Sequence, residues 1–329
     1  MRCISRMKRF CTGISLILIL SFCCSCGSRT YTFPYQAEYG VSSFQVINTN
    51  KASVVTPFAA NLCIVEQDIS GNGTVDVTKV GSALLCDVND AEVLYAKNAH
   101  EKLYPASLTK IMTALVAIKY GSMDQILTAG DCVNIDERGA QLCGLKIGDS
   151  MTLSQALHIL LLYSANDVAM MIAEGVGGSV DHFMELMNEE AKKMGATNTN
   201  FVNPHGLSAD NHYTTAYDLY LILNEAMEYE IFKEIIHMTS YNTIYYDKDG
   251  KEKEFSCKTT NLFLRGDIKM PENVTVVGGK TGTTNAAGHC LALLSRDTAG
   301  APYISVILRS DTRDDLYDEM SNLLSEIGK

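Results

Sequence analysis

Apolar residues recur every three or four positions through the middle of the chain, and this spacing predicts a helical region. The clearest run covers residues 111–118, where one face is apolar. Thr152 and Gln155 have the spacing of a capping box, which marks a second helix start. Helices are therefore expected around residues 107–119, 153–163, 167–176, 180–194, 215–229 and 314–327.

Short β-rich segments on both sides of the helical region predict a sheet. Two hairpins are indicated, with turns at Asn89-Asp90 and Asp249-Gly250. The expected strands are 82–88, 92–97, 241–246, 252–257, 274–280, 287–294 and 303–309, and one further strand is expected within 61–67. The order of elements predicts an α+β fold: an antiparallel β-sheet flanked by helices plus a mostly helical lobe, with the site between them.

The N-terminal segment has the layout of a secretory signal. Four basic residues precede an apolar stretch at 10–24, and no acidic residue occurs before Glu38. Cys26 lies in a context that loosely resembles a lipoprotein cleavage site, although Cys23 occupies a position where leucine is usual. Lipid attachment through Cys26, simple cleavage and a retained short membrane helix are the three alternatives. Each places the rest of the chain outside the cytoplasm, and the first and third anchor it to the membrane.

Composition agrees with an exported globular protein. A chain of 329 residues that is 47% hydrophobic can bury a large core without covalent cross-links. The formal net charge of −11 disfavours nucleic acid and anionic lipid surfaces as partners. Free thiols are expected outside the signal region, with Cys132 and Cys143 as a conceivable disulfide pair. Outside the signal region no C-x-x-C spacing occurs, and the chain has no H-E-x-x-H spacing. Neither a metal nor another cofactor is therefore predicted.

Ser107 and Lys110 lie three positions apart at the start of the first predicted helix. Residues i and i+3 are neighbours on a helix, so the lysine amine can reach the serine hydroxyl. A hydroxyl attacks poorly until a base takes its proton, and lysine serves as that base only when its pKa falls far below about 10.4. The pair indicates a nucleophile and its base, although this spacing alone is common in ordinary helices. Backbone N–H groups at the helix start can stabilise an oxyanion.

Ser164 and Asn166 fall at the junction between two predicted helices. The hydroxyl can relay a proton, and the amide can bond a substrate amide while holding the lysine. Both are also good residues for a helix junction, so an exclusively structural role is the alternative interpretation.

A third segment, Lys280-Thr281-Gly282, lies on a predicted strand that faces the site. Lys280 supplies a fixed positive charge and Thr281 a hydroxyl, which suit a substrate with a free carboxylate. The backbone N–H of Thr283 is a candidate for the second oxyanion donor. Gly279-Lys280-Thr281 also matches the end of a phosphate-binding loop, but such a loop requires glycine at position 274, which is valine.

These three motifs occur in this order in the penicillin-recognising serine enzymes. The segments 104–114, 163–167, 203–207 and 280–284 closely resemble the serine-type D-alanyl-D-alanine carboxypeptidases, the low-molecular-mass penicillin-binding proteins. The resemblance begins near Ala83 and continues almost to the C-terminus. It implies removal of the terminal D-alanine from peptidoglycan stem pentapeptides through an acyl-enzyme, and acylation by β-lactam antibiotics.

The resemblance also implies a role for each residue. Ser107 is the nucleophile, Lys110 the base, Ser164 and Asn166 the relay pair, and 280–282 the carboxylate-binding element. Residues 1–26 are then the signal peptide, 27–75 a tether, and 76–329 the catalytic domain. The loop containing His205 belongs to the resemblance as well, and a loop-structuring role is favoured for this histidine over catalysis.

Several features depart from the family pattern. Thr283 stands where several relatives carry histidine, and the arginine that often follows the last strand has two candidates here, Arg309 and Arg313. Only a short stretch follows Gly282, so the family's C-terminal β-rich domain and terminal anchor are not expected, and anchoring is expected at the other end.

Two other functions are compatible with the motifs. A β-lactamase shares them, but the glutamate segment that commonly holds its hydrolytic water has no counterpart between Asn166 and Lys280. A catalytically silent cell-wall binding protein is the second alternative, which the intact Ser107 and Lys110 disfavour.

Overall fold

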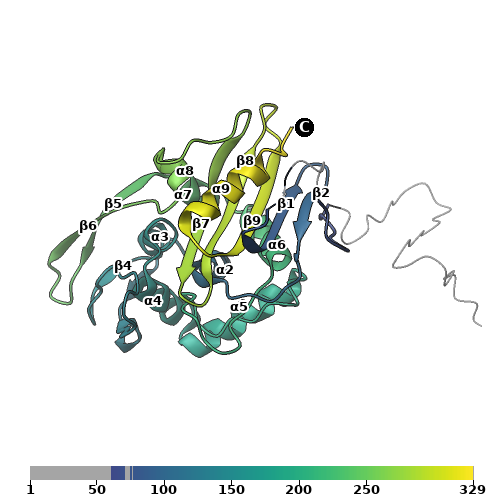
Figure 1. Ribbon diagram of the computed structural model, residues 1–329. Helices are drawn as coiled ribbons and strands as arrows, with labels where there is room; N and C mark the ends of the chain where they lie inside the picture. Colours follow the sequence, from purple (N-terminus) through teal and green to yellow (C-terminus); the bar gives the residue numbers. More distant parts are fainter. Residues whose placement is uncertain (1–60, 71–74, 76, 329) are drawn as a thin grey trace, which may run out of the picture. The chain divides into compact units, whose positions relative to one another are not determined.

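The computed structural model describes residues 61–70, 75 and 77–328. The predicted signal peptide with Cys26, and most of the predicted tether, lie outside the described residues. The described residues contain a five-stranded antiparallel sheet with the order β2-β1-β9-β8-β7 (Figure 1). Its strands are β1 (Val80–Asp87), β2 (Glu92–Lys97), β7 (Thr275–Thr284), β8 (Gly288–Arg296) and β9 (Pro302–Ser310).

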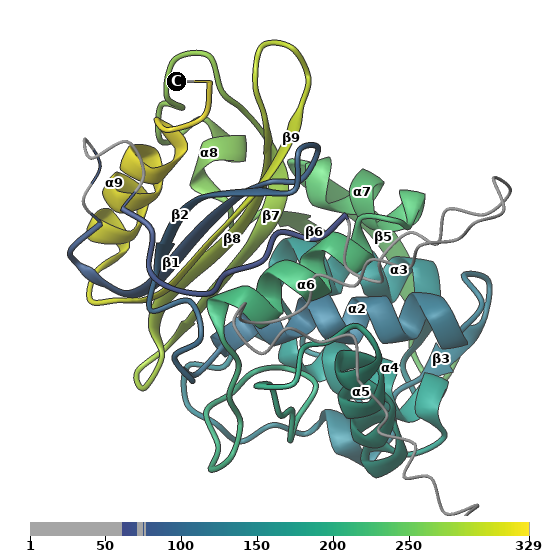
Figure 2. The same ribbon diagram turned by 90° about the vertical axis from the view of Figure 1, so that its right-hand side faces the viewer.

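Both faces of this sheet are covered. Helix α9 (Arg313–Leu324) lies on one face, and α6 (Ala216–Ala226) with the rest of the helical lobe lies on the other (Figure 2). Side chains alternate between the two cores along β8, since Leu293 packs with α9 whereas Ala292 packs with the helical lobe. A strand buried on both sides carries a continuous apolar run, which is why the central strands were recognisable in the sequence.

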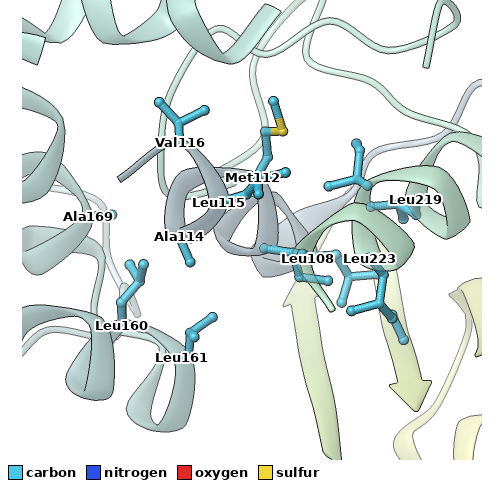
Figure 3. Packing of buried hydrophobic residues seen from close by; sticks show 14 of the residues in the cluster. Leu108, Met112, Ala114, Leu115, Val116, Leu160, Leu161, Ala169, Leu219 and Leu223 are labelled. Atoms are coloured by element: carbon cyan, nitrogen blue, oxygen red, sulfur yellow. The ribbon is translucent and has the colours of Figure 1, made fainter. Parts of the chain in front are cut away.

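The helical lobe is built around α2 (Thr109–Tyr120). Met112 and Leu115 on this helix are fully buried, with Leu160 on one side and Leu223 on another (Figure 3). The surrounding elements are a 3₁₀ turn at Ala106–Leu108, α3 (Leu153–His158), a π-helical turn at Ile159–Tyr163, α4 (Asn166–Gly177), α5 (Val180–Lys193), α6 and α7 (Glu230–His237). The predicted capping box is present at the start of α3, where Thr152 and Gln155 bond each other's backbone N–H.

A second antiparallel sheet lies beside the lobe, with the order β3-β4-β5-β6. Its strands are β3 (Ile126–Thr128), β4 (Ser150–Thr152), β5 (Ser240–Tyr246) and β6 (Glu252–Lys258). The second predicted hairpin forms β5 and β6 and therefore belongs to this smaller sheet. The short elements α8 (Leu262–Arg265) and η2 (Asp131–Val133) complete the described secondary structure.

The α+β arrangement predicted from the sequence is confirmed, and three expectations need correction. Residues 61–67 form no strand, because the Cys63 N–H donates to the Tyr220 hydroxyl at 3.0 Å instead of joining a ladder. Helix α7 was not predicted, although Phe232, Ile235 and Ile236 form its buried stripe. Cys132 and Cys143 are not bonded to each other, since all the cysteines of the described segments are free thiols. No helix among the described residues is long and apolar enough to cross a membrane.

Candidate active site

Ser107 lies in the 3₁₀ turn that leads into α2, and its position depends on two unusual backbone contacts. The preceding residue, Ala106, has a left-handed φ of 48°, which is rare for a residue with a side chain. Gly206 packs directly on the Ala106 carbonyl, so that a Cβ built there would lie 1.9 Å from the oxygen. A Cβ at Gly282 would lie 2.9 Å from the Ser107 nitrogen. Strand β7 can therefore approach the backbone N–H of Ser107 closely because position 282 is glycine.

The Lys110 amine is fully buried and contacts the serine hydroxyl. Its Nζ lies 3.0 Å from Ser107 Oγ, 2.7 Å from Asn166 Oδ1 and 2.6 Å from the His205 carbonyl oxygen. Burial, and to a smaller extent the positive charge of Lys280, hold the pKa of this amine well below its usual range. The neutral form that can accept a proton is thereby favoured, which is the condition set out in the sequence analysis.

Ser164 and Asn166 occupy the predicted helix junction. Ser164 ends the π-helical turn in a left-handed conformation with a φ of 69°, and Asn166 begins α4 two residues later. This geometry turns both side chains toward the buried lysines. Asn166 accepts from Lys110, and the Ser164 hydroxyl accepts a 2.9 Å hydrogen bond from Lys280.

Lys280 differs from its expected placement. The sequence predicts a fixed charge facing the cleft, but the Lys280 side chain is buried, and its amine donates to Ser164 and to the Thr281 carbonyl at 3.0 Å. Burial lowers the pKa of this amine to about 7. Its charge near neutral pH is therefore conditional, and the neighbouring threonines of β7 line the cleft instead.

The loop between α5 and α6 supports the lysine with its backbone. The Asn203 side chain accepts from the Gly206 N–H at 2.7 Å and donates to the Leu207 carbonyl at 2.9 Å. The imidazole of His205 accepts from the Leu207 N–H at 3.1 Å, in agreement with the predicted structuring role. Burial lowers the pKa of His205 to about 3, so this imidazole is neutral at physiological pH. The contact to Lys110 comes from the histidine carbonyl, which the sequence pattern does not reveal.

An open cleft of about 470 Å³ lies in front of these residues. Predicted site residues in its wall are Ser107, Ser164, Asn166, Thr281, Gly282 and Thr283. Of the two candidate arginines, Arg313 lines the cleft, whereas Arg309 lines a different cavity and pairs with Glu101 at 3.5 Å. Arg313 is thus the better placed of the two for a substrate carboxylate.

Several cleft residues were not identified from the sequence. Thr260 bonds Thr281 through their hydroxyls at 2.6 Å, and Gln141, Arg265 and Tyr317 also face the cleft. They come from loops and helices distant in the sequence, and none lies within a recognisable motif. Only the segments 107–110, 164–166 and 280–282 have a motif spacing that can be recognised in the sequence.

Together these residues form a serine–lysine arrangement that is suited to acyl transfer. A hydroxyl next to a neutral buried amine can attack a carbonyl, and backbone N–H groups at a helix start beside a strand edge can hold the oxyanion. The model for the D-alanyl-D-alanine carboxypeptidase family matches residues 72–312, and the chain therefore belongs to this family.

Relatives and solved structures agree with this assignment. The chain is similar to the D-alanyl-D-alanine carboxypeptidases DacF of Bacillus subtilis (32% identical) and DacC of Escherichia coli (35% identical), each match covering 74% of this chain. These matches cover 60% and 59% of the relatives, so the chain spans about three fifths of their length. A D-alanyl-D-alanine carboxypeptidase structure from Mycobacterium tuberculosis gives a TM-score of 0.68 at 26% identity, covering 79% of this chain and 95% of that one. A Streptomyces DD-transpeptidase structure shares the fold, with a TM-score of 0.71 at 24% identity and coverages of 77% and 98%.

Proposed function

We propose that this chain is a serine-type D-Ala-D-Ala carboxypeptidase that removes the terminal D-alanine of peptidoglycan stem pentapeptides. The observation that carries the proposal is the contact between the buried Lys110 amine and Ser107 Oγ at 3.0 Å. Penicillins, which offer a reactive amide in place of the D-Ala-D-Ala bond, acylate the same serine.

The reaction begins with proton transfer from Ser107 to Lys110. The serine oxygen then attacks the carbonyl carbon of the penultimate D-alanine, and the N–H groups of Ser107 and Thr283 stabilise the oxyanion. A proton passes through the Ser164 hydroxyl to the leaving amine as the peptide bond breaks. Water repeats the sequence on the acyl-enzyme and releases the shortened peptide. The close packing of Gly282 on Ser107 supports the proposed pair of oxyanion donors.

The free carboxylate of the substrate binds at the β7 side of the cleft. The hydroxyls of Thr281 and Thr283 lie there, and Arg313 supplies a cation that can form paired hydrogen bonds with a carboxylate. Lys280 contributes through its bond to Ser164 instead of contacting the carboxylate directly. This division of roles follows from the burial of Lys280.

The domain plan and location follow from the same proposal. The signal segment at 1–26 exports the protein and is cut before Cys26, a tether follows at 27–75, and the catalytic domain covers 76–329. Peptidoglycan lies outside the cytoplasm, so the enzyme works at the outer face of the membrane, held there by acylation of Cys26. Mass spectrometry of the mature N-terminus tests this part: an unmodified peptide that starts elsewhere removes the lipid anchor.

The experiment for the activity uses a fluorescent penicillin and a pentapeptide that ends in D-Ala-D-Ala. The wild-type protein is expected to be labelled and to release D-alanine, and Ser107→Ala is expected to lose both. Ser256→Ala, at an exposed position on β6, is the matched control and retains both. Labelling of Ser107→Ala would refute the assigned nucleophile, and fast penicillin turnover without D-alanine release would favour the β-lactamase. Absence of both reactions in the wild type would favour the silent binding protein.

A further inference from the structure

Asp167 is a buried carboxylate that the proposed reaction does not use. It follows Asn166 in the first turn of α4, and only 1% of its surface is exposed. Each of its oxygens accepts two backbone hydrogen bonds. Oδ1 accepts from the N–H groups of Cys143 and Val168 at 2.9 and 3.0 Å, and Oδ2 accepts from those of Gly144 and Leu145 at 2.8 and 3.0 Å.

Three of these four donors belong to the loop between η2 and β4. The same loop contributes Gly139, Ala140 and Gln141 to the wall of the cleft, which β7 also lines. A fourth bond joins the two elements, because the Asn166 N–H donates to the Gln141 carbonyl at 2.8 Å. The start of α4 thus holds the loop, and the same turn carries the amide that contacts Lys110.

We propose that Asp167 is a positioning residue for acylation: its carboxylate fixes the loop at 143–145 to the start of α4, and so holds both the cleft wall and the Asn166 amide that orients Lys110. The inference rests on the proposed function, since it concerns how that site is held. Asp167 touches neither Ser107 nor the cleft, so it acts through the loop and through Asn166.

The negative charge of Asp167 matters as well as its shape. A carboxylate can accept four hydrogen bonds, whereas an asparagine amide offers one oxygen and turns an N–H₂ group toward the remaining donors. Bonds from N–H groups to a charged acceptor are also stronger than those to a neutral one. Asp167 in addition raises the pKa of Lys110, against the larger effects of burial and Lys280. It therefore favours the cation that forms when Lys110 takes the proton of Ser107.

The test compares Asp167→Asn with a control that also disturbs a buried carboxylate. Glu190 on α5 is buried, is held by Lys119, Lys193 and Tyr120, and lies outside the cleft wall. Penicillin acylation is followed by stopped flow, below the unfolding temperature of every variant, to separate the dissociation constant from the rate constant at saturation. We expect Asp167→Asn to lower that rate constant by about 10- to 100-fold and to weaken penicillin binding. Glu190→Gln is expected to stay within about twofold of wild type in both, although both variants melt earlier.

Hydrogen exchange of the wild-type protein supplies a measurement that needs no activity. The amides of Cys143, Gly144 and Leu145 are expected to be protected, and Asp167→Asn to release them selectively. Unprotected amides in the wild type would overturn the proposal, as would a folded Asp167→Asn protein with wild-type acylation constants. If Asp167→Asn does not fold, the wild-type exchange result decides alone. A wild-type protein that no penicillin labels would refute the proposed function, while the exchange result would still decide whether Asp167 fixes the loop.

Discussion

The Lys280 amine donates a 2.9 Å hydrogen bond to the Ser164 hydroxyl, so the strand motif is joined to the helix-junction motif behind the cleft. Two residues further on, Asn166 accepts from the other buried lysine, Lys110. The segment 164–166 therefore lies between the amines of Lys280 and Lys110 and provides each of them with an oxygen as hydrogen-bond acceptor. In the proposed reaction, Ser164 is the member of this segment that passes a proton to the leaving amine.

Replacement of Lys110 tests the base. Lys110→Ala is expected to lower the rate of penicillin acylation by at least about 100-fold, because the serine hydroxyl loses the group that takes its proton. Lys119→Ala, which removes a lysine from the last turn of the same helix, is expected to acylate normally, since Lys119 pairs with Glu190 and Glu225 away from the cleft. Near wild-type acylation by Lys110→Ala would mean that another group is the base.

Burial of Lys280 predicts a pH-dependent cost in stability. Its pKa is about 7 in the folded protein and 10.5 in the reference state, so between these values the unfolded chain binds the additional proton. The free energy of unfolding then rises with pH across this interval, by up to about 1.4 kcal/mol per pH unit.

Lys280→Met removes this dependence while filling a similar volume. We expect the variant to be more stable than wild type at pH 7 and the difference to shrink as the pH approaches 9.5, while acylation falls at every pH. Chemical denaturation at several pH values provides the measurement. Parallel stability curves for the two proteins would show that the Lys280 amine is charged in the folded state throughout this range.

Gly206 is expected to be intolerant of a side chain. Its φ is +87°, and an added Cβ would lie 1.9 Å from the Ala106 carbonyl oxygen, so Gly206→Ala must displace the residue before Ser107. Gly178 has a similar φ of +76° with nothing within 4 Å of an added Cβ, so Gly178→Ala measures the conformational cost alone, about 1 kcal/mol. Gly206→Ala is expected to lose more stability than this control and to acylate more slowly. Equal losses in the two variants, with normal acylation, would contradict the role assigned to this packing.

The two candidate arginines can be separated by kinetics. Arg313→Ala is expected to raise KM for the pentapeptide by about tenfold or more with a smaller change in kcat, because the charge meets the substrate carboxylate at the cleft wall. Arg309→Ala is expected to leave both constants unchanged, since Arg309 lines a separate cavity. The opposite pattern would assign the carboxylate to Arg309.

Local regularities in the sequence were sufficient for much of the fold and for the reactive pair. Ser107 and Lys110 are three positions apart and are therefore neighbours on a helix, and continuous apolar runs mark the central strands, which are buried on both faces. The sequence could not show that the His205 carbonyl completes the surroundings of Lys110, because every residue has such a carbonyl and only the loop path brings this one close. The same limit applies to Asp167, whose three partners in the loop lie 22 to 24 positions earlier in the chain.

Strand periodicity alone also does not give the face of β7 on which Lys280 lies. Val276 and Lys280 are both even-numbered, and in a regular strand they would share one face of the sheet. In β7 they lie on opposite faces, since Val276 packs in the α9 core while Lys280 points toward the helical lobe. The pairing with β8 shifts between Val276 and Gly278, where one additional residue forms a bulge.

That bulge determines which side chains of β7 face the α9 core and which face the helical lobe. Deleting Val277 would let β7 pair regularly with β8 and would leave Val276 and Lys280 on their present opposite faces, because an odd number of positions would then separate them. A strand of unchanged length that paired without the bulge would instead place both residues on one face, so that either the α9 core would lose Val276 or Thr281 would replace Lys280 beside Ser164. The bulge thus lets one strand serve both the α9 core and the catalytic cleft, whereas the β8–β9 turn could vary in length without affecting either face.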